Sequence, residues 1–318
     1  MPLVRSISGL RGTLGDCLTP CLVASYTASY AGIMPSGPVI IGRDGRPSGS
    51  WIEQVVAGTL AACGRKVKII GMAPTPTIQM FVEHSDAAGG IAITASHNPA
   101  EWNGLKFMDS DGIFLGREEN EKLWFMADNH TFRYADCEIQ ELDYIGEKAC
   151  EYHIDSVLSL PFVSENIQAV QNRKFRVVLD AVNASGSFII RELLEQMGCE
   201  VLPLFCDGSG VFPHTPEPLP ENLSQLSGMV ADTNADIGIA VDPDADRLVL
   251  TDNTGKPIGE EKTVSIAIDA VLSNINYFTN FTYSGVVVNL STTRLTRDIA
   301  DKHGADYYLS PEIGRAHV

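Results

Sequence analysis

Short apolar runs and amphipathic stretches alternate along the first hundred residues of the chain. The runs at 39–42, 66–70 and 90–94 are typical of buried strands, whereas 51–63 and 76–84 have the spacing of helices. A glycine directly after the first helix, at position 64, fits a C-terminal cap. The order strand, helix, strand, helix, strand predicts an α/β domain whose strands are mostly parallel.

The same alternation starts again after a charged, mainly helical region at 117–163. In this second repeat the predicted strands are 175–180, 200–204 and 236–241, and the predicted helices are 187–197 and 222–233. The third repeat is shorter, with helices at 261–273 and 293–303 and strands at 286–289 and 306–309. We therefore predict three domains, at 1–150, 151–255 and 256–318, of which the last is partial.

Composition and charge narrow the classes of partner. Of the 318 residues 44% are hydrophobic, enough for buried cores, and the net charge of −17 repels nucleic acid and anionic membranes. No apolar window approaches a membrane span, and no signal peptide is evident, so we expect a cytoplasmic protein without membrane or nucleic-acid partners. Seven scattered cysteines complete no zinc site and are expected to be reduced thiols: Cys17, Cys21, Cys63, Cys137, Cys150, Cys199 and Cys206.

Two polar loops directly follow predicted strands. One contains Ser96, which lacks the Gly-x-Ser-x-Gly context of a hydrolase nucleophile. The other places Asp242, Asp244 and Asp246 at alternate positions after a buried run. In open α/β sheets ligands lie beyond the carboxyl ends of strands, which favours a functional role for both loops. Three adjacent carboxylates repel one another, and a divalent cation such as Mg2+ would remove that repulsion.

The aspartate loop allows two other interpretations. A calcium EF-hand beginning at Asp242 needs glycine at its sixth position and glutamate at its twelfth, where this chain has Arg247 and Asn253. The EF-hand is therefore excluded. A phosphatase with an aspartate nucleophile would use Asp242 for attack. That alternative stays open, although such loops usually stand at the beginning of their domain.

If the two loops lie side by side, a metal held by the aspartates sits next to the oxygen of Ser96. A serine beside a cation favours phosphoryl transfer, because the cation neutralises charge on the phosphate. Asn103 and Gly104 predict a turn, from which Lys106 is able to reach back toward the serine. By itself this pattern leaves Lys106 either a general acid/base or a surface lysine.

These segments together resemble the α-D-phosphohexomutases. Thr94-Ala95-Ser96-His97-Asn98-Pro99, with Asn103-Gly104-Leu105-Lys106, is similar to the phosphoserine loop of that family, and Asp242-Pro243-Asp244-Ala245-Asp246-Arg247 to its metal-binding loop. The segments SGLRG at 8–12, GRDGRPSG at 42–49 and PEPLPENL at 216–223 agree. The resemblance covers the whole chain and implies repeated three-layer α/β domains with mixed, mostly parallel sheets.

The resemblance also implies an activity and a set of site residues. The family comprises phosphoglucomutase, phosphomannomutase and phosphoglucosamine mutase, which interconvert sugar 1- and 6-phosphates through a phosphoserine and a bisphosphate intermediate. By carry-over, the catalytic residues are Ser96, Lys106, Arg11 and His97, and the Mg2+ ligands are Ser96, Asp242, Asp244 and Asp246. The substrate-binding residues are Arg247, Arg43 and Arg46. The partner is a phosphosugar, and the chain is expected to be a monomer or homodimer.

The resemblance is incomplete at the carboxyl end. The family has four domains, and the sequence ends inside what corresponds to the third. GEEK at 259–262 lacks the Ser-Gly of the family's sugar-recognition loop and is interpreted as a helix start. We therefore expect a fragment or truncated product with little mutase activity, and the identity of the sugar stays open among glucosamine, glucose and mannose phosphates. A non-catalytic sugar-phosphate-binding remnant is the alternative.

Overall fold

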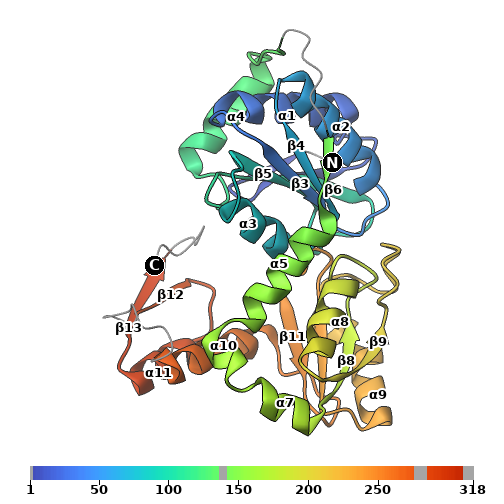
Figure 1. Ribbon diagram of the computed structural model, residues 1–318, viewed down its shortest axis with the longest axis vertical. Helices are drawn as coiled ribbons and strands as arrows, with labels where there is room; N and C mark the ends of the chain where they lie inside the picture. Colours follow the sequence, from blue (N-terminus) through green and yellow to red (C-terminus); the bar gives the residue numbers. More distant parts are fainter. Residues whose placement is uncertain (1–2, 136–141, 276–284, 311–318) are drawn as a thin grey trace.

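A computed structural model describes residues 3–135, 142–275 and 285–310 of the chain (Figure 1). Within these residues the strands form a seven-stranded, a four-stranded and a two-stranded sheet. Every strand and helix that the apolar pattern predicts is present, with ends that differ by at most two residues. The α/β class and the predominance of parallel pairing are confirmed.

The amino-terminal unit is built on the seven-stranded sheet. Its elements are β1 (Val4–Ser6), β2 (Gly9–Thr13), α1 (Pro20–Ile33), β3 (Val39–Arg43), α2 (Gly49–Ala62), β4 (Val67–Met72), α3 (Thr75–Glu83), β5 (Gly89–Ile93), β6 (Trp102–Met108), α4 (Arg117–Asn129) and β7 (Leu142–Tyr144). The strand order is β1-β2-β6-β5-β3-β4-β7. β3 pairs in parallel with β4 and β5, and β4 with β7, whereas β6 is antiparallel to both of its neighbours.

Helices cover both faces of this sheet (Figure 1). Successive side chains of a strand point to opposite faces, so Val39 and Ile41 of β3 pack on the side of α1, α2 and α4. Ile40, between them, packs with Ile78 of α3 on the other side. All four are fully buried, and burial of each such side chain is worth about 1.5–3 kcal/mol. The unit therefore has three layers.

One segment differs from the sequence prediction. The turn expected at Asn103 and Gly104 lies inside strand β6, between β5 and β2. A side chain at Gly104 would collide with the backbone carbonyls of Leu10 and Thr94, so the glycine serves close strand packing. The prediction of a turn was wrong because an Asn-Gly pair inside a strand has the same local signature as a turn.

The second unit carries the four-stranded sheet. Its elements are α5 (Gly146–Leu158), α6 (Pro161–Ser164), α7 (Ile167–Arg173), β8 (Arg176–Asp180), α8 (Gly186–Gln196), β9 (Glu200–Leu204), the 3-10 helix η1 (Pro220–Asn222), α9 (Ser224–Thr233), β10 (Ile237–Val241) and β11 (Leu248–Thr251). The strand order is β11-β10-β8-β9, with β11 antiparallel and the other pairs parallel. Leu226 and Val230 of α9 pack against Val178 of β8 in the core.

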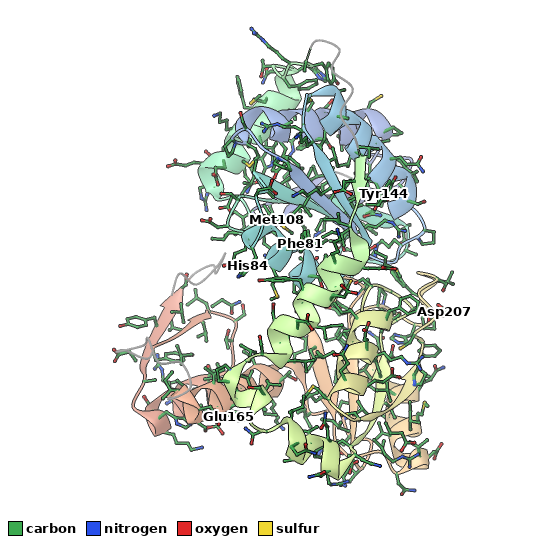
Figure 2. All side chains as sticks on the ribbon, viewed as in Figure 1. Phe81, His84, Met108, Tyr144, Glu165 and Asp207 are labelled. Atoms are coloured by element: carbon green, nitrogen blue, oxygen red, sulfur yellow. The ribbon has the colours of Figure 1, made fainter. Side chains whose placement is uncertain are left out.

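Helix α5 lies along the boundary between these two units (Figure 1). Phe81 of α3 and His84, which caps the end of that helix, are labelled in Figure 2. They contact Tyr152 of α5, with ring centroids 6.1 and 5.2 Å away. On the other side of the boundary, Asp207 marks the loop that follows β9 (Figure 2). The same loop reaches the first unit at Gly210, which packs against the backbone carbonyl of Gly45. The boundary is therefore a packed contact on both sides.

The third unit consists of α10 (Glu260–Ser273), β12 (Gly285–Asn289), α11 (Leu295–His303) and β13 (Asp306–Ser310). β12 and β13 pair in parallel, and Val286 and Val288 pack with Leu272 and Ala300 of the helices. The GEEK segment is the start of α10, as predicted. In the described part of the chain no helix is long and apolar enough to cross a membrane. Six of the cysteines are free thiols; the seventh, Cys137, lies outside the described residues.

Candidate active site

Ser96 lies in the loop that follows β5, and its backbone is held in a strained conformation. Its φ angle is +52°, in the left-handed region that non-glycine residues rarely adopt. Its N–H donates to Thr94 Oγ1 at 2.8 Å, and its carbonyl accepts from the Arg46 guanidinium at 2.7 Å. Strained residues persist where the surroundings hold them, and they concentrate at functional sites.

Arg46 is the main support of this serine loop. Besides the Ser96 carbonyl, its guanidinium donates to the carbonyls of Trp102 (3.0 Å) and Asn98, and to the Asp44 carboxylate (3.3 Å). The side chain has no exposed surface. Arg46, expected at a substrate, therefore lies behind the loop. Arg43 lies nearby with its side chain 24% exposed, 3.6 Å from Glu53.

The aspartate loop follows β10 and meets the serine loop across the boundary between the units. Ser96 Oγ donates to Asp242 Oδ2 at 2.9 Å, although the two residues are 146 positions apart. One carboxylate oxygen from each of Asp242, Asp244 and Asp246 lies within 4.8 Å of the others. Burial, and then the charges of the other two carboxylates, raise the pKa of Asp242 well above its usual value. The repulsion inferred from the sequence is thus present in the structure.

Lys106 compensates part of this negative charge. From β6 its Nζ donates to Asp244 Oδ2 at 2.7 Å and to Asp246 Oδ2 at 2.8 Å. The side chain is 4% exposed, so Lys106 is not a surface lysine. Burial alone lowers the pKa of Lys106, but the two carboxylates outweigh burial and hold that pKa above its usual value. Lys106 is therefore a charged member of the site.

Asp244 uses its two carboxylate oxygens differently. Its Oδ2 accepts from Lys106 and also from Thr75 Oγ1 at 2.7 Å. Its Oδ1 is buried and has no hydrogen-bond partner among the residues that the structure describes. An unpartnered buried carboxylate oxygen is costly unless something coordinates it. Together with Asp242 and Asp246, Asp244 offers the hard oxygen donors that a divalent cation prefers. These residues therefore fit the cation that the sequence analysis expects.

The remaining site residues form a partly exposed rim. His97 Nδ1 lies 3.3 Å from Ser96 Oγ, and its Nε2 lies 3.8 Å from Glu217 Oε1. Glu217 also accepts from Arg247 at 3.4 Å. Burial, and secondarily the charge of Arg247, lower the pKa of His97. The rim therefore presents a guanidinium and a largely neutral imidazole close to the serine.

Arg11 reaches the serine loop from β2, where its guanidinium donates to Asn98 Oδ1 at 3.2 Å. The structure thus brings all the predicted residues to one region except Arg43, which points toward α2, and Arg46, which lies behind the loop. Sequence reasoning missed Thr75 and Glu217. Glu217 lies in the 216–223 segment that the resemblance singled out, whereas Thr75 follows a proline and carries no local signal.

Comparisons with known proteins show which family this chain resembles. Residues 4–134 match the family model of phosphoglucomutase/phosphomannomutase α/β/α domain I, and residues 151–255 match domain II. A phosphoglucomutase/phosphomannomutase of Thermococcus kodakarensis is 33% identical over 307 residues, covering 93% of this chain and 64% of the relative. A protein of Methanosphaera stadtmanae named probable phosphoglucosamine mutase is 33% identical over 325 residues, covering 100% of this chain and 67% of the relative.

The fold agrees as well. The crystal structure of a phosphoglucomutase/phosphomannomutase family protein from Burkholderia thailandensis superposes with a TM-score of 0.79 at 24% identity, covering 96% of this chain and 66% of that one. The chain therefore belongs to the phosphoglucomutase/phosphomannomutase family, the α-D-phosphohexomutases. The relatives named in these comparisons are mutases, which are isomerases that transfer a phosphoryl group within their substrate. The chain spans 64% of the length of the Thermococcus relative.

Proposed function

We propose that this chain carries the phosphoryl-transfer centre of a phosphohexomutase, with Ser96 as the residue that accepts and returns the phosphoryl group. The observation that carries the proposal is the contact between Ser96 Oγ and Asp242 Oδ2, 2.9 Å across two loops that are far apart in sequence. A serine hydroxyl, three carboxylates and a buried lysine in one place suit phosphoryl transfer, which depends on positioning and on charge compensation.

The proposed reaction has two balanced halves. In one, the bond between phosphorus and Ser96 Oγ breaks while a bond from phosphorus to a sugar hydroxyl oxygen forms. We propose that the charged Lys106 gives a proton to the departing Ser96 Oγ and recovers one from the sugar hydroxyl. In the other, the second phosphoryl group of the sugar bisphosphate is transferred to Ser96 Oγ, which loses its proton while the freed sugar hydroxyl gains one. Arg11, His97 and Arg247 supply donors around the phosphate.

We propose that Mg2+ is held by Asp242, Asp244 and Asp246, with an oxygen on the side chain of Ser96 as a further ligand. Bound there, the cation neutralises charge both on the carboxylates and on the phosphoryl group in transit. The protein's own contribution is to hold Asp242 and Asp244 buried, with Asp246 at the exposed edge, before the substrate arrives. Arg46 belongs to the support of the serine loop in this proposal, because its donors are already bonded to the protein.

The test is direct phosphorylation of the serine. Incubation of the chain with Mg2+ and glucose 1,6-bisphosphate, followed by intact-mass measurement, is expected to show one added phosphate. Ser96→Ala is expected to show none. Ser50→Ala is the matched control, because Ser50 lies in the same unit, is exposed, and its Oγ donates to the nearby Pro47 carbonyl instead of to the aspartate loop. Absence of phosphate on the unaltered chain, or its presence on Ser96→Ala, contradicts the proposal.

The same variants decide between the proposed mutase chemistry and a phosphatase. An aspartate-nucleophile phosphatase hydrolyses p-nitrophenyl phosphate after Ser96→Ala and fails after Asp242→Asn. The rates of serine phosphorylation by glucose, mannose and glucosamine bisphosphates then rank the substrates. That this chain alone converts little sugar 1-phosphate to sugar 6-phosphate stays a prediction.

A further inference from the structure

Thr75, the first residue of α3, makes two contacts with the proposed metal ligand Asp244. Its backbone N–H donates to the Asp244 carbonyl at 2.9 Å, and its Oγ1 donates to Asp244 Oδ2 at 2.7 Å. The residues are 169 positions apart and belong to different units. Thr75 is 1% exposed and Asp244 is fully buried, so water does not compete for either bond.

These contacts divide the two oxygens of the Asp244 carboxylate between different roles. Oδ2 is occupied by Thr75 and Lys106, whereas Oδ1 is buried and without a partner among the described residues. A carboxylate held at one oxygen by two donors from different directions cannot rotate freely about its bond to Cβ. The direction in which Oδ1 points is therefore fixed by the groups that bind Oδ2.

We propose that Thr75 is a positioning residue for the cation site, which orients Asp244 so that Oδ1 faces the metal. The inference rests on the proposed function of the aspartate loop. Residues behind a metal ligand set its orientation, and their removal typically weakens metal binding about 10–100-fold.

Thr75 suits this role better than Lys106 does. The lysine ammonium ends a flexible four-carbon stem and donates to Asp246 as well. The threonine side chain is β-branched and stiff at χ1, and the Asp244 carbonyl fixes its backbone. The orientation of a ligand on the second unit thus depends on a helix start of the first.

The test compares Mg2+ affinity by isothermal titration calorimetry on the full 318-residue chain. Thr75→Val removes the hydroxyl at nearly constant volume and is expected to weaken Mg2+ binding about 10–100-fold. Thr75→Ser keeps the hydroxyl and is expected to bind close to the unaltered chain. Thr75→Ala repeats the deletion should the valine variant not fold, and thermal melting identifies folded variants.

Thr77 provides the matched control. It is on the same turn of α3, is fully buried, and its Oγ1 bonds to His153 Nδ1 at 2.8 Å instead of to the aspartate loop. Thr77→Val is therefore expected to lower the melting temperature and leave Mg2+ affinity unchanged.

Each other outcome counts against a specific claim. Unchanged affinity in folded Thr75→Val or Thr75→Ala, or an equal loss in Thr77→Val, overturns the positioning role while the metal site stands. Absence of Mg2+ binding by the unaltered chain overturns the metal site itself, and the positioning role with it.

Discussion

Replacement of Arg46 by methionine is expected to destabilise the protein strongly, since this guanidinium holds the serine loop from inside. The variant removes a fully buried cation and leaves its hydrogen-bond partners without a donor. These are the Asp44 carboxylate, itself fully buried, and the backbone carbonyls of Ser96, Asn98 and Trp102. Burial already raises the pKa of Asp44 even with Arg46 beside it.

The magnitude follows from what is left behind. Breaking a buried ion pair by deleting one partner costs about 3–5 kcal/mol. Each of the three carbonyls would add about 1–3 kcal/mol if left unsatisfied, but water that fills the space of the lost guanidinium is expected to satisfy them. Thr94 Oγ1 still donates to Asp44 at 2.7 Å, and the methionine stem retains some packing, so we expect a loss of about 4 kcal/mol. That is a large share of the roughly 5–15 kcal/mol of a typical domain.

Urea denaturation followed by tryptophan fluorescence measures this loss. At a slope of about 2 kcal/mol per molar, 4 kcal/mol lowers the transition midpoint by about 2 M. Arg191→Met is the control, because Arg191 of α8 is 49% exposed and pairs at 2.8 Å with Glu195, which is 48% exposed, a pair worth about 1 kcal/mol or less. Equal midpoints for the two variants, or a shift below about 0.5 M for Arg46→Met, would refute the reasoning.

Two further predictions concern charge. Lys106→Met leaves the carboxylates of Asp244 and Asp246 uncompensated, so this variant is expected to melt at a lower temperature than the unaltered chain in EDTA. Mg2+ is then expected to raise the melting temperature of the variant more than that of the unaltered chain, and equal shifts in both would contradict this. His214 lies 2.9 Å from Asp180 and 2.8 Å from a backbone carbonyl, and although burial lowers its pKa, the bond with Asp180 outweighs burial and raises it. The stability that this bond contributes is therefore fully present below the unfolded pKa of about 6.5 and is lost as the pH rises through the higher folded pKa. His214→Gln should thus lower the melting temperature most at acid pH. Melting curves recorded across the pH range check this, and an equal effect at every pH would show that the charged bond contributes nothing.

Local pattern was sufficient wherever an element's signal lies within its own residues. The strands at 39–43 and 237–241 are apolar runs of the length of a buried strand, and Gly64 ends α2 with φ +78°, as its position predicts. Helix α1 was not predicted. Its Pro20–Ile33 sequence has small and apolar residues on all sides and lacks the polar face that makes a helix recognisable, because the helix is largely buried.

The candidate site divides in the same way. The motifs around Ser96 and Asp242 were recognisable from the sequence because each loop carries several polar residues within a few positions of a strand end. The roles of Arg46 and Thr75 were not, since an arginine in a polar loop and a threonine between prolines have no distinguishing local signature. Arg46 looked like a residue for a substrate until its donors were seen to end on the protein's own carbonyls.

By itself, then, the sequence determined the α/β elements, their order and the chemical groups available for phosphoryl transfer. The tertiary structure alone decided which of those groups meet: Ser96 with Asp242, and both Lys106 and Thr75 with the same oxygen of Asp244. These pairs are more than 100 positions apart, and what joins them is the packing of the two units, which brings the loop after β10 against the loop after β5, strand β6 and the start of α3. Contacts of that range depend on strand order and domain packing, which no window of neighbouring residues contains.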